Sequence, residues 1–422
     1  MPTFGSACQA GLKVFTTLSI IAAPLAAQQP GVVPSLMQDA AVRAALTAAK
    51  NSEPQTIDDQ VRFCEVAAPP FKETARGEVL KREFAQLGLQ NVRVDRAGNV
   101  LGDRPGEALH PHLVVAAHLD TVFPEDTSVK VTRRGLRLEG PGIGDNCRGL
   151  AVLVAAIRSM NQAAVRTPGT VTFVADVGEE GLGDLRGMKA LFGEAAKDQI
   201  DRFVSIDNAD PHVTIIGVGS HRYRVTFKGP GGHSYADFGL PNPANALGRA
   251  ITKISEFHVS EDLRTTFNVG RVGGGTSVNA IPSEAWMEVD LRSSDPAALT
   301  ALDAKFRQAM DRAVVEENGR WGRPGVVTVV KQLVGDRPAG SISEDAPIVA
   351  TALAAARAVG LPSGLSEGST DANLPMSLHI PAITIGGGGQ SMNAHAPNEW
   401  FDSTDSWKGT QNVVLLTIAL AR

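Results

Sequence analysis

The chain has 422 residues, of which 43% are hydrophobic and 20% charged, a composition typical of a globular protein with one large domain or two. Its net charge is -5 and it contains no long basic run, which argues against nucleic acid and anionic membrane surfaces as partners. Only 2 Tyr and 4 Trp residues occur, too few for a surface on which bases stack.

The N-terminal segment has the pattern of a secretory signal. Lys13 precedes an apolar run over residues 14–27, and a polar break begins at Gln28. We therefore predict a signal peptide at 1–27 and export to the periplasm or the extracellular space. An uncleaved anchor is the alternative, but the apolar run is short for a membrane span and no stable membrane partner is expected.

The segments that follow alternate between helical and strand patterns. Residues 35–50 and 57–88 show helical spacing of apolar positions. The runs "PHLVVAAH", "GTVTFVAD", "DRFVSID" and "IPAITIGG" are nearly continuous in apolar residues, which is typical of strands covered by helices on both faces. "RGLAVLVAAIRSM" and "PIVATALAAARAVG" are predicted helices between them. This alternation predicts an α/β fold with a mixed, mostly parallel sheet flanked by helices.

The middle of the chain has a different pattern. In "HRYRVTFKG" apolar and charged residues alternate, which is typical of a strand with one face in solvent. A helix, two strands joined by a Gly turn ("TTFNVGRVGG" and "NAIPSEAWMEVDLR"), a second helix and a last strand follow. The order β-α-β-β-α-β predicts a ferredoxin-like α+β domain at 218–338, inserted into the α/β domain.

Each buried strand leads to a group that can bind a metal ion. Because ligands bind at the carboxyl ends of strands in such sheets, we expect these groups to lie along one edge. A Gly-rich loop, "GPGIGDNCRG", adds a carboxylate before a helix. The candidates are His118, Asp120, Asp145, Glu179, Glu180, Asp207 and His395.

Two histidines and three carboxylates, one of them shared, suit a pair of zinc ions with a position left open for water. Cobalt or manganese are alternatives at such a site. Asp120 could accept the second imidazole N–H of His118 and hold its orientation. Taken singly, these candidates also have structural explanations. His118 could be a core histidine, Asp145 a helix cap, and Glu179 and Glu180 a solvated loop pair, and Asp201 or Asp210 could take the place of Asp207.

Two cysteines remain beyond the signal segment, Cys64 and Cys147. They could pair in an exported protein, but the sequence does not place them within bonding distance. Cys147 could also act as a zinc ligand. Since harder groups already fill the site, we expect it to pack in the first turn of its helix.

The motifs "HLDTV", "GPGIGDNCRG", "GEEG", "SIDNAD", "GPGGHS", "VNAIPSEAWMEVDLR", "STDAN" and "NAHAPNEW" resemble those of one zinc metallopeptidase family. It includes carboxypeptidase G, peptidase T, carnosinase and the aminoacylase-type deacylases. The matches cover nearly the whole chain after the signal segment, in the same order. The chain departs from many relatives after the shared Asp, where it has Asn146, Cys147 and Arg148.

The resemblance implies roles for the site residues. His118 and Asp207 would hold one zinc ion, Glu180 and His395 the other, and Asp145 would bridge them. Glu179 would be the general base toward a metal-activated water, with Asp120 supporting the site. It also implies a cis peptide bond between Asp145 and Asn146.

The resemblance further implies a catalytic domain at 28–217 and 339–422, with 218–338 as a lid and dimerisation domain of a homodimer. His233 would stabilise the oxyanion, in some relatives across the dimer. The implied substrate contacts are Asn279, Arg292, Ser369 and Thr370.

The predicted function is therefore an exported zinc peptidase that hydrolyses an amide bond in small peptides. A deacylase or amidohydrolase acting on N-acyl amino acids is the first alternative, with the same machinery. A non-catalytic binding protein on this fold is the second.

Overall fold

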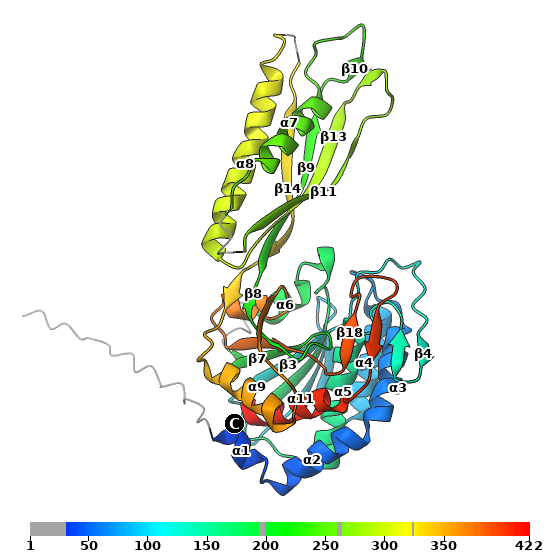
Figure 1. The fold of residues 1–422 in the computed structure, drawn as a ribbon, viewed down its shortest axis with the longest axis vertical. Helices are drawn as coiled ribbons and strands as arrows, with labels where there is room; N and C mark the ends of the chain where they lie inside the picture. The colour runs from blue at the N-terminus through cyan, green and yellow to red at the C-terminus, as the bar shows by residue number, and fades with distance from the viewer. Residues whose placement is uncertain (1–30, 194–198, 260–263, 323–324) are drawn as a thin grey trace, which may run out of the picture.

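The computed structural model describes residues 31–193, 199–259, 264–322 and 325–422, and the predicted signal peptide at 1–27 lies outside them. Figure 1 shows a large lobe and a narrower lobe that stands out from it. The narrower one is formed by the elements between Gly219 and Arg337 and is called the inserted lobe here. Among the described residues no helix combines the length and apolar character needed to cross a membrane.

The large lobe is built on a nine-stranded mixed sheet with the order β1-β2-β6-β3-β7-β17-β8-β15, and β16 pairs with β8. The central strands β6, β3, β7 and β17 run parallel, whereas β1, β2 and β15 join antiparallel toward the edges. The mixed, mostly parallel sheet is thus confirmed. Its strands are β1 (Gln90–Val94), β2 (Val100–Arg104), β3 (Leu113–His118), β6 (Val171–Asp176), β7 (Arg202–Ile206), β8 (Val213–Gly217), β15 (Gly340–Ser341), β16 (Leu365–Gly368) and β17 (Ala382–Ile385).

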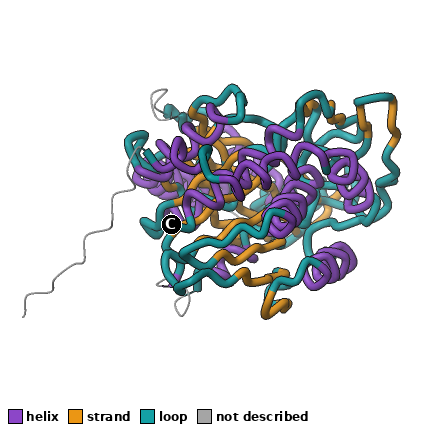
Figure 2. Tube along the Cα trace, turned by 90° about the horizontal axis from the view of Figure 1, so that it is seen from below, coloured by secondary structure: helices purple, strands orange, loops and turns teal. Residues whose placement is uncertain are grey.

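Helices cover both faces of this sheet, as the continuous apolar strands require, and Figure 2 shows them gathered around its strands. α5 is buried along most of its length and packs with α2, α3 and α11 on one face, while α6 and α10 contribute to the core on the other. The helices are α1 (Val32–Leu36), α2 (Ala40–Asn51), α3 (Glu53–Cys64), α4 (Thr74–Gln86), α5 (Cys147–Gln162), α6 (Arg186–Leu191), α9 (Pro347–Ala358), α10 (Asn373–Ser377) and α11 (Trp407–Leu420).

A second sheet of the large lobe has the order β18-β19-β5-β4 and joins distant segments of the chain. It consists of β4 (Thr132–Arg134), β5 (Arg137–Glu139), β18 (Gln390–Met392) and β19 (Trp400–Asp402). A short 3-10 helix, η1 (Gly181–Gly183), follows the two adjacent glutamates.

The inserted lobe is a four-stranded antiparallel sheet with the order β11-β13-β9-β14 and two helices on one face. In β9 the predicted alternation holds, since Tyr223, Val225 and Phe227 are buried against the helices. Together with β10 and β12, which pair with each other, its elements are β9 (Gly219–Lys228), β10 (Gly232–His233), α7 (Pro243–Ser255), β11 (Thr266–Gly274), β12 (Ala280–Ile281), β13 (Glu284–Ser293), α8 (Pro296–Asn318) and β14 (Thr328–Arg337).

Proline and capping residues interrupt three predicted elements. The helical segment 57–88 is broken, because the prolines at 69 and 70 lack the N–H that a helix needs. The segment 35–50 is divided where Asp39 accepts the N–H groups of Ala41 and Val42 and starts α2. The strand predicted in "NAIPSEAWMEVDLR" is divided at Pro282 into β12 and β13.

Candidate dinuclear metal centre

The predicted ligands meet at the carboxyl edge of the central parallel strands. His118 is the last residue of β3, Asp207 directly follows β7, and Glu180 lies four residues beyond β6. Asp145 stands in the loop that leads into α5, and His395 follows β18. Since β3, β6 and β7 are parallel, their ends lie together and carry these side chains to one place.

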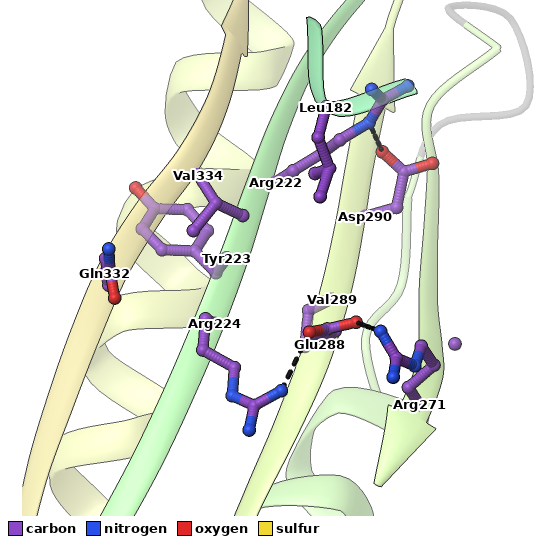
Figure 3. Close-up of a pocket in the computed structure, with 11 residues that line it drawn as sticks. Leu182, Arg222, Tyr223, Arg224, Arg271, Glu288, Val289, Asp290, Gln332 and Val334 are labelled. Carbon is purple, nitrogen blue, oxygen red and sulfur yellow. Dashed lines mark hydrogen bonds and ion pairs between the residues drawn. The ribbon is translucent and has the colours of Figure 1, made fainter. Parts of the chain in front are cut away.

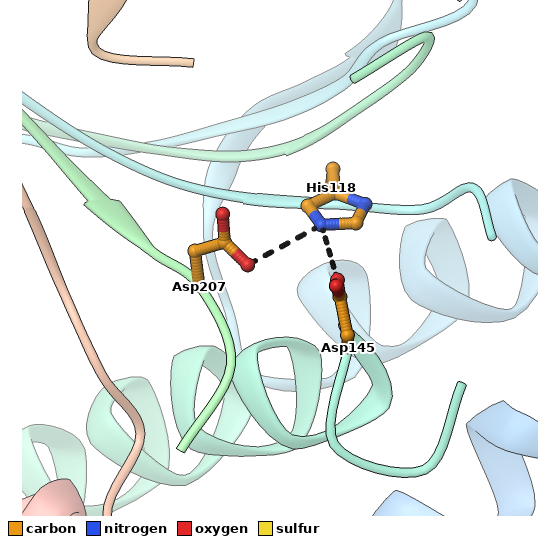
Figure 4. Close-up of side chains that lie close together, drawn as sticks. All are labelled: His118, Asp145 and Asp207. Carbon is orange, nitrogen blue, oxygen red and sulfur yellow. Dashed lines mark ion pairs between the residues drawn. The ribbon is translucent and has the colours of Figure 1, made fainter. Parts of the chain in front are cut away.

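The site contains two groups of donor atoms that share Asp145. In the first, His118 Nε2 lies 3.1 Å from Asp145 Oδ1 and 3.6 Å from Asp207 Oδ1 (Figure 4). In the second, His395 Nε2 lies 3.3 Å from Asp145 Oδ2 and 3.2 Å from Glu180 Oε1. Asp145 therefore directs one oxygen to each group, which is the arrangement of a carboxylate between two metal ions.

The donor atoms fit divalent cations. His118 Nε2, Asp145 Oδ1 and Glu180 Oε1 are buried and have no hydrogen-bond partner among the described residues. Burial raises the pKa of Glu180 to about 8, and the negative charge of Asp145 adds to this. Such uncompensated buried carboxylates are stabilised when a cation binds between them. Imidazole nitrogen and carboxylate oxygen are the donors that zinc accepts.

Asp120 has a different contact from the predicted one. Its carboxylate accepts the N–H groups of Gly178, Glu179 and Glu180 at 3.1, 3.1 and 2.9 Å. His118 Nδ1 is 3.1 Å from the carbonyl oxygen of Asp120, and the carboxylate oxygen is farther, at 3.7 Å. Because a carbonyl only accepts, Nδ1 carries the proton and Nε2 is left free as a ligand. The Asp120 carboxylate, which was expected to hold His118, lies within 3.7 Å of the same nitrogen and also accepts from the glutamate loop.

The two adjacent glutamates point to different partners. Glu180 faces His395, whereas Glu179 Oε1 accepts a hydrogen bond of 3.0 Å from Nη1 of Arg337. Arg337 also donates from Nη2 to the carbonyl of Glu179. Burial raises the pKa of Glu179, and the Arg337 guanidinium opposes this. Sequence reasoning missed Arg337, whose only signal is a lone cation at the end of the inserted segment.

Glu399 is a second residue that sequence reasoning missed, although it stands in the motif "NAHAPNEW". Its carboxylate accepts the N–H groups of Gly142, Gly144 and Asp145 at 2.9, 2.7 and 2.9 Å. Burial raises its pKa to about 7 in spite of these bonds. Glu399 therefore shapes the loop that presents Asp145. The expected cis peptide bond between Asp145 and Asn146 is confirmed.

The family model for Peptidase family M20/M25/M40 matches residues 114–419, the greater part of the chain and all of the metal-site residues. The chain belongs to this family. It is thus a hydrolase of the M20 peptidase group, as the resemblance implied, with a candidate site for two metal ions whose identity is open.

Three curated relatives illustrate the range of the family. The uncharacterized protein YqjE of Bacillus subtilis (strain 168) is 24% identical over 378 residues, covering 86% of this chain and 98% of its own. Carboxypeptidase G2 of Pseudomonas sp. (strain RS-16) is 26% identical over 269 residues, covering 59% and 63%. A succinyl-diaminopimelate desuccinylase of Corynebacterium glutamicum is 24% identical over 351 residues, covering 80% and 89%.

Solved structures share the fold. A tripeptidase of Staphylococcus aureus has a TM-score of 0.72 at 22% identity and covers 88% of this chain and 99% of its own. The YXEP protein of Bacillus subtilis, described as a dinuclear metal binding peptidase from the M20 family, has a TM-score of 0.63 at 17% identity, covering 87% and 98%.

The three residues after Asp145 all have structural partners. The Asn146 side chain caps α5 at Gly149 and donates to the carbonyl of Ile206. Cys147 is buried in the first turn, as expected, but it forms a disulfide with Cys64, with a Cα–Cα distance of 5.4 Å. Its sulfur is therefore no zinc ligand. Arg148 turns away to form a buried ion pair with Glu53 at 2.9 Å.

The two aspartates near Asp207 are engaged elsewhere. Asp201 contacts His110 Nδ1 at 2.6 Å at the opposite end of β7, and Asp210 contacts His212. Neither belongs to the metal groups. Neither Asp201 nor Asp210 therefore takes the place of Asp207 in the metal groups.

Of the predicted substrate-contact residues, Arg292 and Ser369 line a hollow, whereas the Thr370 hydroxyl is buried in the core. Arg292 and Ser369 line one hollow of about 250 Å³ between the lobes, and Arg292 also pairs with Asp290 at 2.7 Å. Ser369 accepts a hydrogen bond of 3.2 Å from Arg337. The Thr370 hydroxyl is buried against that of Thr384 at 2.7 Å, so it is occupied within the core.

His233 and Asn279 lie apart from the metal groups. His233 is the last residue of β10 and Asn279 directly precedes β12, and Figure 1 places β10 at the far end of the inserted lobe from β3 and β7. His233 is exposed, and its Nδ1 accepts the N–H groups of Tyr235 and Ala236 at 3.2 and 3.3 Å. The proton of a neutral His233 is therefore on Nε2, which faces no partner of its own loop.

Proposed function

We propose that this chain is a dinuclear metallopeptidase that hydrolyses an amide bond in small peptides, with Glu179 as the general base. The observation that supports it most is the position of Asp145, whose two oxygens serve two donor groups, while Glu179 belongs to neither group and is hydrogen-bonded to Arg337. Two zinc ions are the proposed cofactors, with cobalt or manganese as alternatives. The proposed ligands besides Asp145 are His118, Asp207, Glu180 and His395.

Each residue then has one task. When bound, two zinc ions supply Lewis-acid chemistry, polarising the substrate carbonyl and lowering the pKa of a water. Glu179 accepts a proton from that water as the water oxygen attacks the carbonyl carbon. It then delivers the proton to the nitrogen of the leaving amine as the C–N bond breaks. A carboxylic acid and an amine result, and Glu179 is ionised again.

We assign the oxyanion contact to His233 of a second copy of the chain. Its Nε2–H is a free donor, which is what a developing oxyanion requires. Because β10 lies far from the metal groups of its own chain, a homodimer formed through the inserted lobes would supply it. Asn279 would come from the same copy, and Arg292 would bind the substrate's terminal carboxylate with its guanidinium fork.

A deacylase of N-acyl amino acids is the second candidate. The similarity to a succinyl-diaminopimelate desuccinylase over 80% of this chain supports it. The hollow with Arg292 suits the free carboxylate of an N-acyl amino acid as well as that of a peptide. The two candidates differ in the acyl group, not in the chemistry of the amide bond.

Export is proposed on two grounds. The N-terminal segment has a signal pattern, and a disulfide joins Cys64 to Cys147 in the described part of the chain. Disulfides persist in oxidising compartments such as the periplasm and the extracellular space. N-terminal sequencing of protein from cell fractions tests this, and an intact N-terminus in the cytosol would contradict it.

The decisive experiment for the function is a substrate panel with purified, metal-analysed protein. Dipeptides and tripeptides are compared with N-acetyl and N-succinyl amino acids, before and after chelation. Peptide hydrolysis that is lost with the metal and returns with zinc or cobalt supports the first proposal. A preference for acylated amino acids supports the deacylase. Protein without metal and without activity on the panel would support a binding protein on this fold.

A further inference from the structure

Arg337 connects the inserted lobe to the proposed base. It is the last residue of β14, where it pairs in register with Ser220 of β9, and it is 3% exposed. Nη1 donates to Glu179 Oε1 at 3.0 Å and to Ser369 Oγ at 3.2 Å, while Nη2 donates to the carbonyl of Glu179. One guanidinium thus contacts both the side chain and the main chain of Glu179.

The inserted lobe has further contacts with the same loop. Arg222 of β9 donates to the carbonyl of Gly181, and its Nε lies 3.4 Å from Asp290 Oδ1 (Figure 3). The N–H of Asp336 donates to Asp184 Oδ1 at 2.7 Å. The loop that carries both glutamates is therefore bound to β9 and β14 along its length.

We propose that Arg337 is a positioning residue for Glu179, and that β14 thereby couples the placement of the inserted lobe to the placement of the base. The inference rests on the proposed function, in which Glu179 is that base. Glu179 directly precedes the proposed ligand Glu180, so its buried carboxylate has another stable place, which is on a metal ion. The charge-assisted bonds from Arg337 hold the Glu179 carboxylate away from the metal positions.

The geometry requires an arginine. A guanidinium presents several N–H groups in a fixed fork, so it donates in two directions at once. A lysine at the same position keeps the positive charge but not the fork. Arg337→Lys therefore separates the effect of charge from the effect of orientation, and Arg337→Ala removes both.

Kinetics and metal content of these variants test the inference. We expect Arg337→Ala to lower kcat about 100-fold, the loss typical of a displaced catalytic group, with KM changed less than about threefold and metal content unchanged. Added guanidinium should restore part of kcat. Arg337→Lys should fall between the wild type and Arg337→Ala.

The matched control is Arg224→Ala, which removes another arginine of the inserted sheet. Arg224 pairs with Glu288 at 2.8 Å, away from the glutamate loop, and its loss should leave kcat within about twofold, as for most substitutions outside a site. If Arg337→Ala raises KM instead of lowering kcat, Arg337 binds substrate and the inference is wrong. An unchanged kcat would also overturn it.

Absorption spectra of the cobalt-loaded proteins test the inference independently of the proposed function. In cobalt-loaded Arg337→Ala, a released Glu179 should enter the coordination sphere and change the visible absorption bands. The double variant with Glu179→Ala should return to the wild-type spectrum. If the wild type hydrolyses nothing on the panel, the proposed function fails, and these spectra still decide where Arg337 holds Glu179. Identical spectra in all three proteins would contradict the inference.

Discussion

Cys64, the last residue of α3, is joined by a disulfide to Cys147, the first residue of α5. Cys147 lies two residues beyond Asp145, so the bond fastens the loop of the shared ligand to a helix 83 residues away in sequence. The disulfide therefore constrains the candidate metal centre as well as the fold.

Replacing both cysteines with serine should lower the free energy of unfolding. Closing a loop of this length removes chain entropy from the unfolded state worth about 4 to 5 kcal/mol. Urea unfolding of the metal-free proteins measures the difference. A difference below about 1 kcal/mol would contradict a structural role for the bond.

Glu179→Gln should retain both metal ions and lose nearly all turnover. The amide is close in shape to the carboxylate but cannot accept a proton from water, and general bases contribute about 100- to 10,000-fold in rate. Metal content and kcat, measured on the same sample, test both the retention of the metal ions and the loss of turnover. A variant of normal activity would exclude Glu179 as the base.

Asp145→Asn and His395→Ala should differ in metal content. Asp145 contacts both donor groups, so its loss weakens both sites, whereas His395 belongs to the second group alone. We expect His395→Ala to keep the ion held by His118 and Asp207. Metal titration followed by mass spectrometry distinguishes the two patterns. Asp210→Asn is the control, because Asp210 pairs with His212 outside the groups.

Glu399→Gln should weaken metal binding without contacting the metals. One amide oxygen cannot replace the two carboxylate oxygens that accept from Gly142, Gly144 and Asp145. Residues that orient ligands typically change metal affinity about 10- to 100-fold. Competition with a chelator measures the affinity. Asp402→Asn in the same segment should have no such effect, and equal affinities for all three proteins would refute this role.

Mixing two inactive variants tests whether His233 acts between subunits. His233→Ala should lower kcat about 100- to 1,000-fold, as for other oxyanion donors. Co-expressed with Glu179→Gln, it should form mixed dimers in which one site has both groups, restoring about a quarter of the activity in a random mixture. No restoration, with mixed dimers present, would place His233 in the site of its own chain.

The sequence by itself determined the α/β fold, the order of the elements and the candidate ligands at the strand ends. These follow from local patterns: continuous apolar runs between helices give buried parallel strands, and parallel strands bring their carboxyl ends together. The motifs then indicated which of the two adjacent glutamates is the expected metal ligand.

Only the tertiary structure decided the partners that come from far along the chain. Arg337 is 158 residues from Glu179, and Glu399 is 254 residues from Asp145. The pairing of Cys64 with Cys147, which are 83 residues apart, was likewise out of reach. No local pattern encodes such contacts, because they depend on how strand β14 and the C-terminal segment pack against loops that the sheet has already placed.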